Sequence, residues 1–332
     1  MQGLHRDERL DVLALGLQDT PPGSAAVSLA QRTTRRDHDA LDAVRVLSLR
    51  GAPHLHRRAD LPVLRRELRP RSDAQLAEWA PGHGVTGVEH VDALVELIRS
   101  EFPGDTATKG ELSAAVGSRA PRELTRWCEG CGAEHVLDGV FRLCTLLAGV
   151  ELEPAGSRLV FRRPQGPPPP VEPPGEPTLL TAYLRLVGPV TRQDARTWLG
   201  AGPRDPWPEL RSVVVDERVL LLLHDAGLLP APDPPRVLLL PPRDPYLLGP
   251  RWLVAPDADV ARRLWRPVGS PGAVVVDGVV TGTWRSSTTG RTMTVEVDAP
   301  RGTTPRRELA AQAELLAHVR GADALEPHVV VV

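Results

Sequence analysis

A proline-rich segment near the middle of the chain limits what it can fold into. Eight of the fourteen residues from 164 to 177 are proline. Proline cannot donate the backbone hydrogen bond that a helix interior or a central strand needs. The segment is therefore predicted to be a semi-rigid, extended spacer. The whole chain has 332 residues, which is enough for two or three domains with cores of their own.

A short sequence repeat lies on either side of this spacer. The stretches TKGELSAAVG (108–117) and TRQDARTWLG (191–200) share a threonine, a basic residue after it, an acid three positions on and a final glycine. Each is predicted to be a short helix with a capping box at its start and a glycine at its end. Capping preferences alone could also produce this match.

The segments that follow extend the match. The first repeat precedes a predicted helix over 135–150 and two strands around a Pro-Ala-Gly-Ser turn. The second precedes LRSVVVDERVLLLLHDAG, which predicts a hairpin. Helix, turn, helix and hairpin is the order of a winged helix. A third, degenerate unit is predicted near the N-terminus, where residues 40–51 form a helix that ends at Gly51 and a short strand follows.

The C-terminal part is rich in strand signals. Residues 237–248 and 273–284 are strand-like, and Asp277-Gly278 between apolar runs predicts a type I′ hairpin turn. A further strand (TMTVEV), an amphipathic helix (306–321) and a closing strand (HVVVV) follow. The fold class is therefore α+β, with tandem winged-helix domains and a β-rich C-terminal domain. The predicted domains are a winged-helix-like region (1–75), a winged-helix domain (76–163), the spacer (164–177), a second winged-helix domain (178–232) and a C-terminal α+β domain (233–332).

The composition excludes several classes of protein. Apolar runs fall short of the ~18–20 residues that span a bilayer, and the N-terminus lacks the apolar core of a signal peptide. Three cysteines argue against a disulfide framework and fit a reducing compartment, so a cytoplasmic protein is expected. The P-loop, GxGxxG, HExxH and GxSxG motifs are all missing, which excludes the usual NTPases, Rossmann enzymes, zincins and α/β-hydrolases.

Charge is spread unevenly along the chain. The net charge is only −2, yet residues 32–71 contain eleven arginines and five acidic residues. This cluster is either a solvated helix face or a surface that contacts phosphates. Within it, His54 and His56 fall on one face of a predicted strand. They could bind a metal or a phosphate, or form a solvated pair at a strand edge.

Four residues raise the question of zinc. Cys128 and Cys131 have the spacing at which two thiolates share one ion, and His135 and Cys144 follow. The remaining spacing fits no zinc module, and Cys144 lies in the apolar pattern of a helix, where a free cysteine is usually a small hydrophobic residue. A turn with buried thiols is the preferred interpretation, and no metal or other cofactor is predicted.

Four segments resemble a known family. They are RGAPHLHRRADLP (50–62), GPVTRQDARTWLG (188–200), VLLLPPRDPYLLGPRW (237–252) and VVVDGVVTGTWR (274–285). They look like segments shared by the AlkZ/YcaQ-like winged-helix proteins, and the resemblance extends with gaps from about residue 13 to about residue 321. The family includes DNA glycosylases that remove bulky alkylated or crosslinked bases. The resemblance implies tandem winged helices around a DNA-binding channel.

The resemblance also indicates a candidate site. Family glycosylases have a Gln-apolar-Gln or Gln-apolar-Asp motif in their N-terminal region, and the matching stretch here is Gln18-Asp19-Thr20. Gln18 keeps the first position, Asp19 replaces the apolar residue and Thr20 replaces the last. Side chains at i and i+2 of an extended segment can hold a water together. Alternatively, Asp19 and Thr20 only cap a turn.

We therefore expect a monomeric, double-stranded-DNA-binding protein that acts on damaged or alkylated DNA. The low aromatic content, 4%, favours duplex over single strands. The alternative is a non-catalytic DNA-binding regulator or scaffold. The residues expected to contact DNA are Arg35, Arg36, Arg50, His54, His56, Arg57, Arg58 and Lys109.

Overall fold

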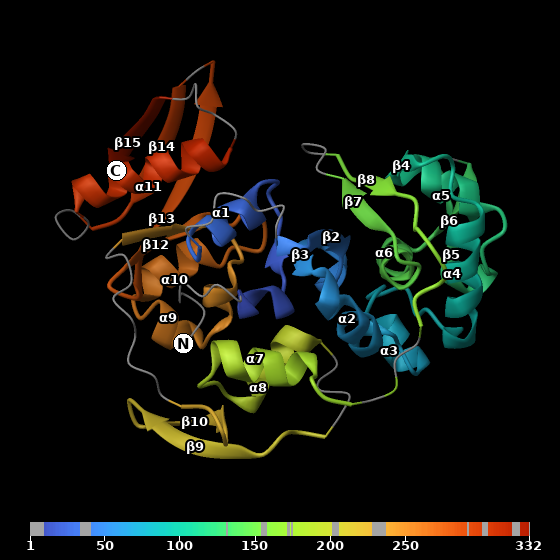
Figure 1. Ribbon diagram of the computed structural model, residues 1–332, viewed down its shortest axis with the longest axis horizontal. Helices are drawn as coiled ribbons and strands as arrows, with labels where there is room; N and C mark the ends of the chain where they lie inside the picture. Colours follow the sequence, from blue (N-terminus) through green and yellow to red (C-terminus); the bar gives the residue numbers. More distant parts are fainter. Residues whose placement is uncertain are drawn as a thin grey trace. The chain divides into compact units, whose positions relative to one another are not determined.

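The chain forms two compact units. The computed structural model describes residues 10–33, 41–130, 132–153, 158–170, 173, 175–200, 206–227, 237–290, 292–300, 305–320 and 326–331. One unit, the terminal unit, combines Met1–His38, Thr181–Trp198 and Trp207–Val332. The other, the central unit, contains Asp39–Leu180 and Leu199–Pro206. Both contain helices and strands, so the α+β class is confirmed (Figure 1). The finer domain boundaries stay predictions.

A five-stranded sheet forms the centre of the terminal unit. The strand order is β11-β12-β13-β14-β15, and all neighbours are antiparallel except β14 and β15. The predicted turn at Asp277-Gly278 is confirmed, because both residues have positive φ, 47° and 82°. The strands are β11 (Val237–Leu240), β12 (Gly272–Val276), β13 (Val279–Thr289), β14 (Thr292–Asp298) and β15 (Glu326–Val331).

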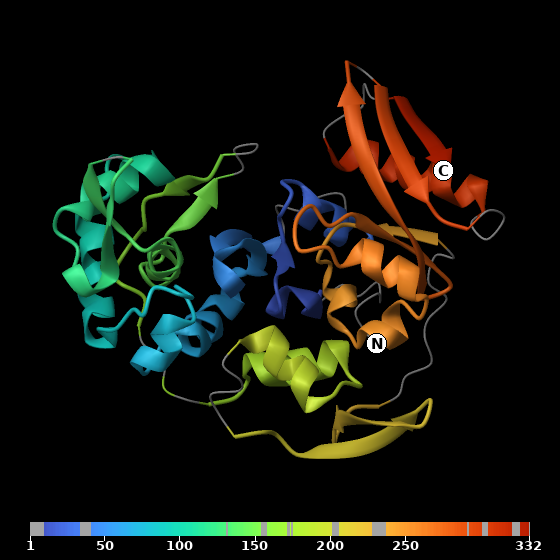
Figure 2. The ribbon, with the colours of Figure 1, turned by 180° about the vertical axis from the view of Figure 1, so that it is seen from behind.

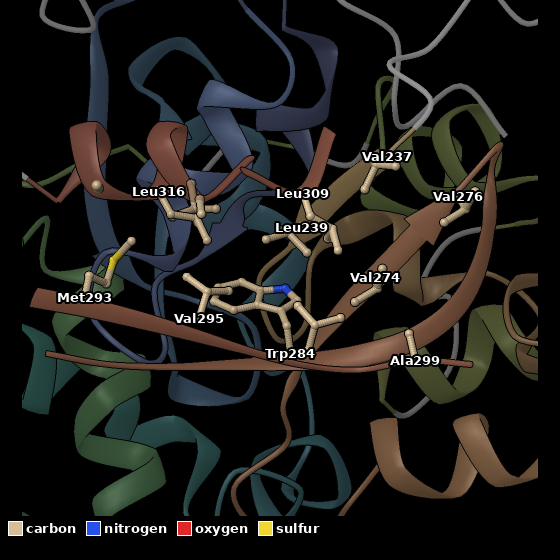
Figure 3. Close-up of a cluster of buried hydrophobic side chains, with 14 residues drawn as sticks. Val237, Leu239, Val274, Val276, Trp284, Met293, Val295, Ala299, Leu309 and Leu316 are labelled. Carbon is tan, nitrogen blue, oxygen red and sulfur yellow. The ribbon is translucent and has the colours of Figure 1, made fainter. Parts of the chain in front are cut away.

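Helices cover both faces of this sheet. Alternate residues of β11 and β12 face opposite cores, which explains why both strands are continuous apolar runs. On one face α11 (Arg306–Val319) packs against the sheet, and Figure 3 shows Trp284 among Val295, Leu239 and Leu309. On the other lie η7 (Pro245–Leu248), α9 (Arg251–Val254) and α10 (Ala258–Leu264).

Trp284 needs a glycine opposite it. Its indole Nε1 donates to the Leu240 carbonyl at 2.8 Å. The ring lies over Gly272, where an added Cβ would come within 2.3 Å of that nitrogen and 2.6 Å of the Leu240 oxygen. Any larger residue at position 272 would therefore displace the central tryptophan.

The N-terminal helix α1 (Ser24–Ala30) is joined to the C-terminal sheet by a buried ion pair. The two guanidinium nitrogens of Arg32 lie 2.6 and 2.9 Å from the two carboxylate oxygens of Asp244. Ser28 Oγ and the Tyr246 backbone N–H also donate to that carboxylate, at 2.6 and 2.9 Å. The two charged side chains are only 1% and 0% exposed. Both charges are thus fully paired inside the core.

A second set of elements in the terminal unit follows the predicted repeat. In sequence order it contains α7 (Leu179–Val187), α8 (Arg192–Leu199), β9 (Leu210–Val215) and β10 (Arg218–Leu223). Reciprocal bonds between Thr191 and Asp194 confirm the capping box at the start of α8. The predicted hairpin is also confirmed, and its turn residues Asp216 and Glu217 both have positive φ. Figure 2 shows this hairpin from behind.

The central unit contains the first repeat. Its elements are α4 (Val91–Ser100), β4 (Thr106–Thr108), α5 (Lys109–Gly117), β5 (Thr125–Cys128), β6 (Ala133–Val136), α6 (Asp138–Leu147), β7 (Glu151–Glu153) and β8 (Val160–Arg162). Thr108 and Glu111 form the predicted capping box of α5. The prediction that a glycine caps the C-terminal end of this helix is wrong by one residue, because Gly117 is still helical and Ser118 is the C-cap. Phe141 of α6 packs edge-on against Phe161 of β8 in the core.

The helix predicted over residues 40–51 is wrong. The segment forms β2 (Ala43–Leu47), which pairs antiparallel with β3 (Pro53–Arg57). Val44 and Val46 are buried while Ala43 and Arg45 are partly exposed, so the apolar period is two. The remaining short elements are η1 (Asp11–Ala14), β1 (Leu17–Gln18), η3 (Leu49–Gly51), η4 (Arg58–Asp60), α2 (Leu61–Leu68), α3 (Asp73–Ala77), η5 (Val88–His90) and η6 (Arg122–Leu124).

The proline-rich spacer contains neither helix nor strand in its described residues, as predicted. It is held against the central unit rather than standing free. Arg66 donates to the Pro177 carbonyl at 2.5 Å, and Arg99 donates to that of Gly166 at 2.6 Å. Across the described ranges, no helix combines the length and apolarity that crossing a membrane requires.

Breaking the Arg32–Asp244 pair should destabilise the protein strongly. Asp244→Ala or Arg32→Met leaves one buried charge unpaired, which typically costs about 3–5 kcal/mol. Urea denaturation should show this loss for each single variant and a smaller loss for the double variant than the sum of the two. Arg262→Gln is the control, since Arg262 pairs with Asp259 on the surface and should change little. Additive losses would contradict a coupled pair.

Cys144 should be inert towards thiol reagents. It is fully buried in α6, and this burial raises the pKa of its thiol well above the ordinary value. Cys128 is only partly buried. In a thiol titration of the native protein, Cys144→Ala should leave the number of fast-reacting thiols unchanged, whereas Cys128→Ser should lower it by one. A fast thiol lost in Cys144→Ala would show that α6 opens readily.

Candidate functional site

Gln18 is the part of the candidate motif that the fold leaves available. It ends β1, directly after the fully buried Leu17, and its own side chain is half-buried. Within the described ranges, its amide has no hydrogen-bond partner. A half-buried amide with unused donors and acceptor can bind a water or a substrate atom.

The Asp19 side chain caps the first turn of α1. Its Oδ1 accepts a hydrogen bond from the backbone N–H of Ala25 at 3.0 Å. Ala25 is the second residue of α1, so the carboxylate satisfies one of the free N–H groups at the helix start. Ser24 Oγ donates to the Pro21 carbonyl at 2.6 Å and closes the same turn. The sequence alternative that Asp19 and Thr20 cap a turn is therefore confirmed for Asp19 alone.

Thr20 is exposed at the tip of this turn. Its hydroxyl makes no hydrogen bond with any residue that the structure describes. Gln18 and Thr20 are thus the two polar side chains of the motif that remain open to a ligand. Their common support is α1, which the Arg32–Asp244 pair anchors to the sheet.

The two histidines predicted to contact DNA are buried. His54 and His56 do share a face of β3, with ring centroids 5.8 Å apart. However, they are only 5% and 0% exposed, and His56 Nε2 lies 2.9 Å from Ser48 Oγ. The alternative of a solvated pair is therefore wrong, and their DNA contact stays a prediction that this burial argues against.

Much of the arginine-rich segment is also used inside the fold. Arg32 is buried with Asp244. Arg65 donates to the Leu146 carbonyl at 3.1 Å, and burial lowers its pKa. Arg66 pairs with Glu67 at 3.1 Å, and Arg69 pairs with Asp92. The local excess of positive charge in the sequence is therefore larger than the positive charge that a ligand would meet at the surface.

The other predicted DNA contacts are more exposed. Arg57 lies 3.4 Å from Asp60, and Arg58 pairs with Asp42 at 3.2 Å and with Glu151. The hydrogen bond to Glu151 raises the pKa of Arg58 despite some desolvation. Arg50 is exposed at the surface. Arg35 and Arg36 lie outside the described residues.

Lys109 belongs to a basic cluster at the start of α6. It pairs with Asp138, the first residue of that helix, and Arg142 contacts the same carboxylate at 2.8 Å. Desolvation alone would raise the pKa of Asp138, but the hydrogen bond from Lys109 and the charge of Arg142 outweigh it and lower the pKa. Arg142 also donates to the Gly51 carbonyl at 3.0 Å, next to Arg50.

Sequence reasoning missed Arg142. Its spacing of four residues from Asp138 on one helix was a usable signal. Gly51 is restricted by the same contact, because an added Cβ would lie 2.8 Å from Arg142 Cδ, and its φ is +67°. The basic cluster thus consists of Lys109 and Arg142, which share the Asp138 carboxylate, and Arg50 precedes the glycine that Arg142 contacts.

The structure gives the zinc hypothesis no further support. In the described part of the chain, no three His, Cys, Asp or Glu side chains form a group that could hold a metal ion. Cys144 is buried in α6, as its apolar pattern predicted, but Cys128 is only partly buried, so the expected burial of its thiol is wrong. Cys131 lies outside the described residues.

Comparisons with known proteins identify the family. The family model described as DNA glycosylase AlkZ-like matches residues 12–319. Among solved structures, the Streptomyces sahachiroi DNA glycosylase AlkZ is similar, with 20% identity, a TM-score of 0.61, and coverage of 99% of this chain and 96% of that one. At this identity the structural likeness shows the fold alone. A search of curated proteins gives no match. Because the family model covers nearly the whole chain, the protein belongs to the AlkZ-like family of DNA glycosylases.

Proposed function

We propose that the protein hydrolyses the N-glycosidic bond of an alkylated base in double-stranded DNA. The observation that carries this proposal is the side chain of Gln18. It occupies the first position of the family motif, it is half-buried at the end of β1, and its amide has no partner in the described part of the fold. A residue held in place by neighbours but left unbonded is suited to orient a water.

The chemistry requires orientation more than proton transfer. Breaking the bond builds positive charge on the deoxyribose, and a water must attack C1′ from the side opposite the leaving base. The Gln18 amide cannot act as a base near neutral pH, but it can hold the water through its oxygen and its N–H groups. The Thr20 hydroxyl, two residues on, can supply a second hydrogen bond.

Asp19 acts in this scheme as a positioning residue. Its hydrogen bond to Ala25 N fixes the turn that presents Thr20 and Gln18. Its charge lies at the positive end of α1, where a carboxylate is stabilised. The motif therefore departs from the family pattern in a way the fold explains, because the middle residue supports the turn.

The motif contains few side chains that can act as a general acid or base, which favours a particular class of nucleobase as the leaving group. A purine alkylated at a ring nitrogen carries a positive charge and leaves as a neutral molecule, without a proton donor. Such a leaving group suits a motif whose polar side chains are Gln18 and Thr20. Bulky lesions suit the protein better than small ones, since a channel built of winged helices need not extract a normal base from the stack.

Duplex binding is proposed for the winged-helix arrangement. In the central unit, α4, β4, α5, α6, β7 and β8 occur in the winged-helix order, with η6 and the β5–β6 hairpin inserted between α5 and α6, and the sheet order is β4-β8-β7. The helix α6 then stands where a recognition helix would, with the basic cluster at its first turn. The terminal unit contains a shorter version of the same arrangement, formed by α7, α8, β9 and β10. In it, the bridge between Val190 and Leu221 corresponds to the pairing of β4 with β8 in the central unit.

Gln18→Ala should abolish most base release without loss of duplex binding. Removal of the water-orienting amide is expected to lower the single-turnover rate by about 10²-fold. The measurement is alkali-labile site formation in alkylated duplex DNA at saturating protein. Gln193→Ala, which alters an exposed glutamine on α8 of the same unit, is the matched control. An unchanged rate in Gln18→Ala would contradict the proposed role.

Substitutions at Asp19 should separate positioning from charge. Asn keeps the oxygen that accepts from Ala25 N, so Asp19→Asn should retain most of the rate. Asp19→Ala removes the cap and should lower both the rate and the thermal stability, by about 1 kcal/mol for the cap. If Asp19→Asn and Asp19→Ala lower the rate by the same factor, the carboxylate charge itself takes part in the reaction.

The second candidate function is that of a non-catalytic DNA-binding protein. The observation that favours it is the use of Asp19 as a helix cap together with the loss of the second Gln or Asp of the motif. No base release by the wild type from any alkylated duplex, with duplex binding intact, would establish this alternative.

A further inference from the structure

We propose that a pocket beside the candidate motif binds the phosphate group of a nucleotide. This inference rests on the proposed function, which requires a nucleic-acid strand to lie next to Gln18. The pocket lies wholly within the terminal unit and has a volume of about 420 Å³. Pro21 and Pro22, which directly follow the motif, form part of its wall.

Two arginines give the pocket a positive charge. Arg285 of β13 and Arg320, the residue after α11, both line it, and none of the described residues that line it is acidic. Within the ranges that the structure describes, neither guanidinium forms an ion pair. Among the described residues, no acidic side chain neutralises this charge, so an anionic ligand would be attracted to the pocket.

The hydrogen bonds of these arginines leave donors for a ligand. Arg320 Nη1 donates to Ser286 Oγ at 2.7 Å, and Arg285 Nη2 donates to the Gly269 carbonyl at 2.5 Å. A guanidinium has five N–H donors, so each group retains several. The Ser286 hydroxyl accepts from Arg320, and its own hydrogen remains available to an anion. Burial lowers the pKa of Arg320, a cost that a bound anion would offset.

The shape and chemistry of the wall favour a phosphate ester. Guanidinium forks match the oxygens of phosphate, and a third donor at Ser286 suits a tetrahedral group. The five prolines of the lining have no N–H to donate and present apolar ring surface. The volume falls within the range of about 300–1,000 Å³ typical of small-molecule sites. It therefore has room for the sugar attached to the phosphate.

A phosphate at this position would fix the register of a DNA strand on the motif. Pro21 follows Thr20 in the chain, so the pocket begins where the motif ends. Phosphate contacts set the position of a protein along a strand, whereas other groups act on the base. The arginines would then select which nucleotide meets Gln18. The same chemistry would also bind a free nucleotide, and the experiment separates these two sources.

The test compares wild type with the double variant Arg285→Gln/Arg320→Gln. The matched control is Arg306→Gln/Arg307→Gln, which removes two exposed arginines from the other end of α11. Duplex affinity is measured by fluorescence anisotropy at several salt concentrations. Binding of 2′-deoxyadenosine 5′-monophosphate and of inorganic phosphate is measured by calorimetry. Thermal unfolding confirms that each variant is folded.

If the pocket holds a DNA phosphate, the pocket variant should lose about tenfold or more in duplex affinity relative to the control. Its salt dependence should also flatten by about one released counterion. If the pocket holds a free nucleotide, the monophosphate should bind wild type and not the pocket variant, with duplex affinity unchanged. Equal behaviour of the pocket and control variants in both measurements would overturn the proposal.

Failure of this proposal can be told apart from failure of the proposed function. The pocket variant should lower duplex affinity, whereas Gln18→Ala should lower the single-turnover rate at saturating protein and leave duplex affinity unchanged. If the wild type releases no base, but the pocket variant binds phosphate more weakly than the wild type does, the proposed function is contradicted and the pocket proposal is supported.

Discussion

The buried pair of Arg32 and Asp244 is the interaction on which the rest of the terminal unit depends. Two ions in a core lose their hydration, and they are tolerated only when each is fully hydrogen-bonded. Here the guanidinium meets both carboxylate oxygens, and Ser28 and the Tyr246 N–H complete the set. The pair holds α1 on the C-terminal sheet. Because α1 also carries the cap from Asp19, it determines where Gln18 and Thr20 lie.

The distribution of arginine follows a related rule. A guanidinium that meets a carbonyl or a carboxylate inside the fold serves the fold, as Arg65 and Arg66 do. One that lines a cavity without an acidic partner in the described chain, as Arg285 and Arg320 do, is available to a ligand. Counting charges along the sequence cannot distinguish these cases, since the partner comes from another part of the chain. The basic cluster around Asp138 is intermediate, because two cations, Lys109 and Arg142, share one carboxylate.

Local signals in the sequence predicted local structure well. The two capping boxes, the Asp277-Gly278 turn, the β9–β10 hairpin and the final helix all formed where expected. Each depends on contacts within a few residues, so the chemistry is complete in the segment itself. The helix predicted over residues 40–51 was wrong because the segment is short and its preference for a strand is decided by pairing with β3. The expectation that the two histidines of β3 form a solvated pair was wrong for a similar reason, since their burial depends on what packs over the strand.

By itself, the sequence determined the α+β class, the spacer, the repeated capped helices and, through its resemblance to a family, the position of the motif. Only the tertiary structure decided the roles within that motif. It turned Asp19 towards the first turn of α1, left the Gln18 amide without a described partner, and placed Arg285 and Arg320 around a pocket behind Pro21. The physical reason is that capping and turn formation are local, whereas burial, cavities and buried ion pairs can depend on residues far apart in the chain, as Arg32 and Asp244 are.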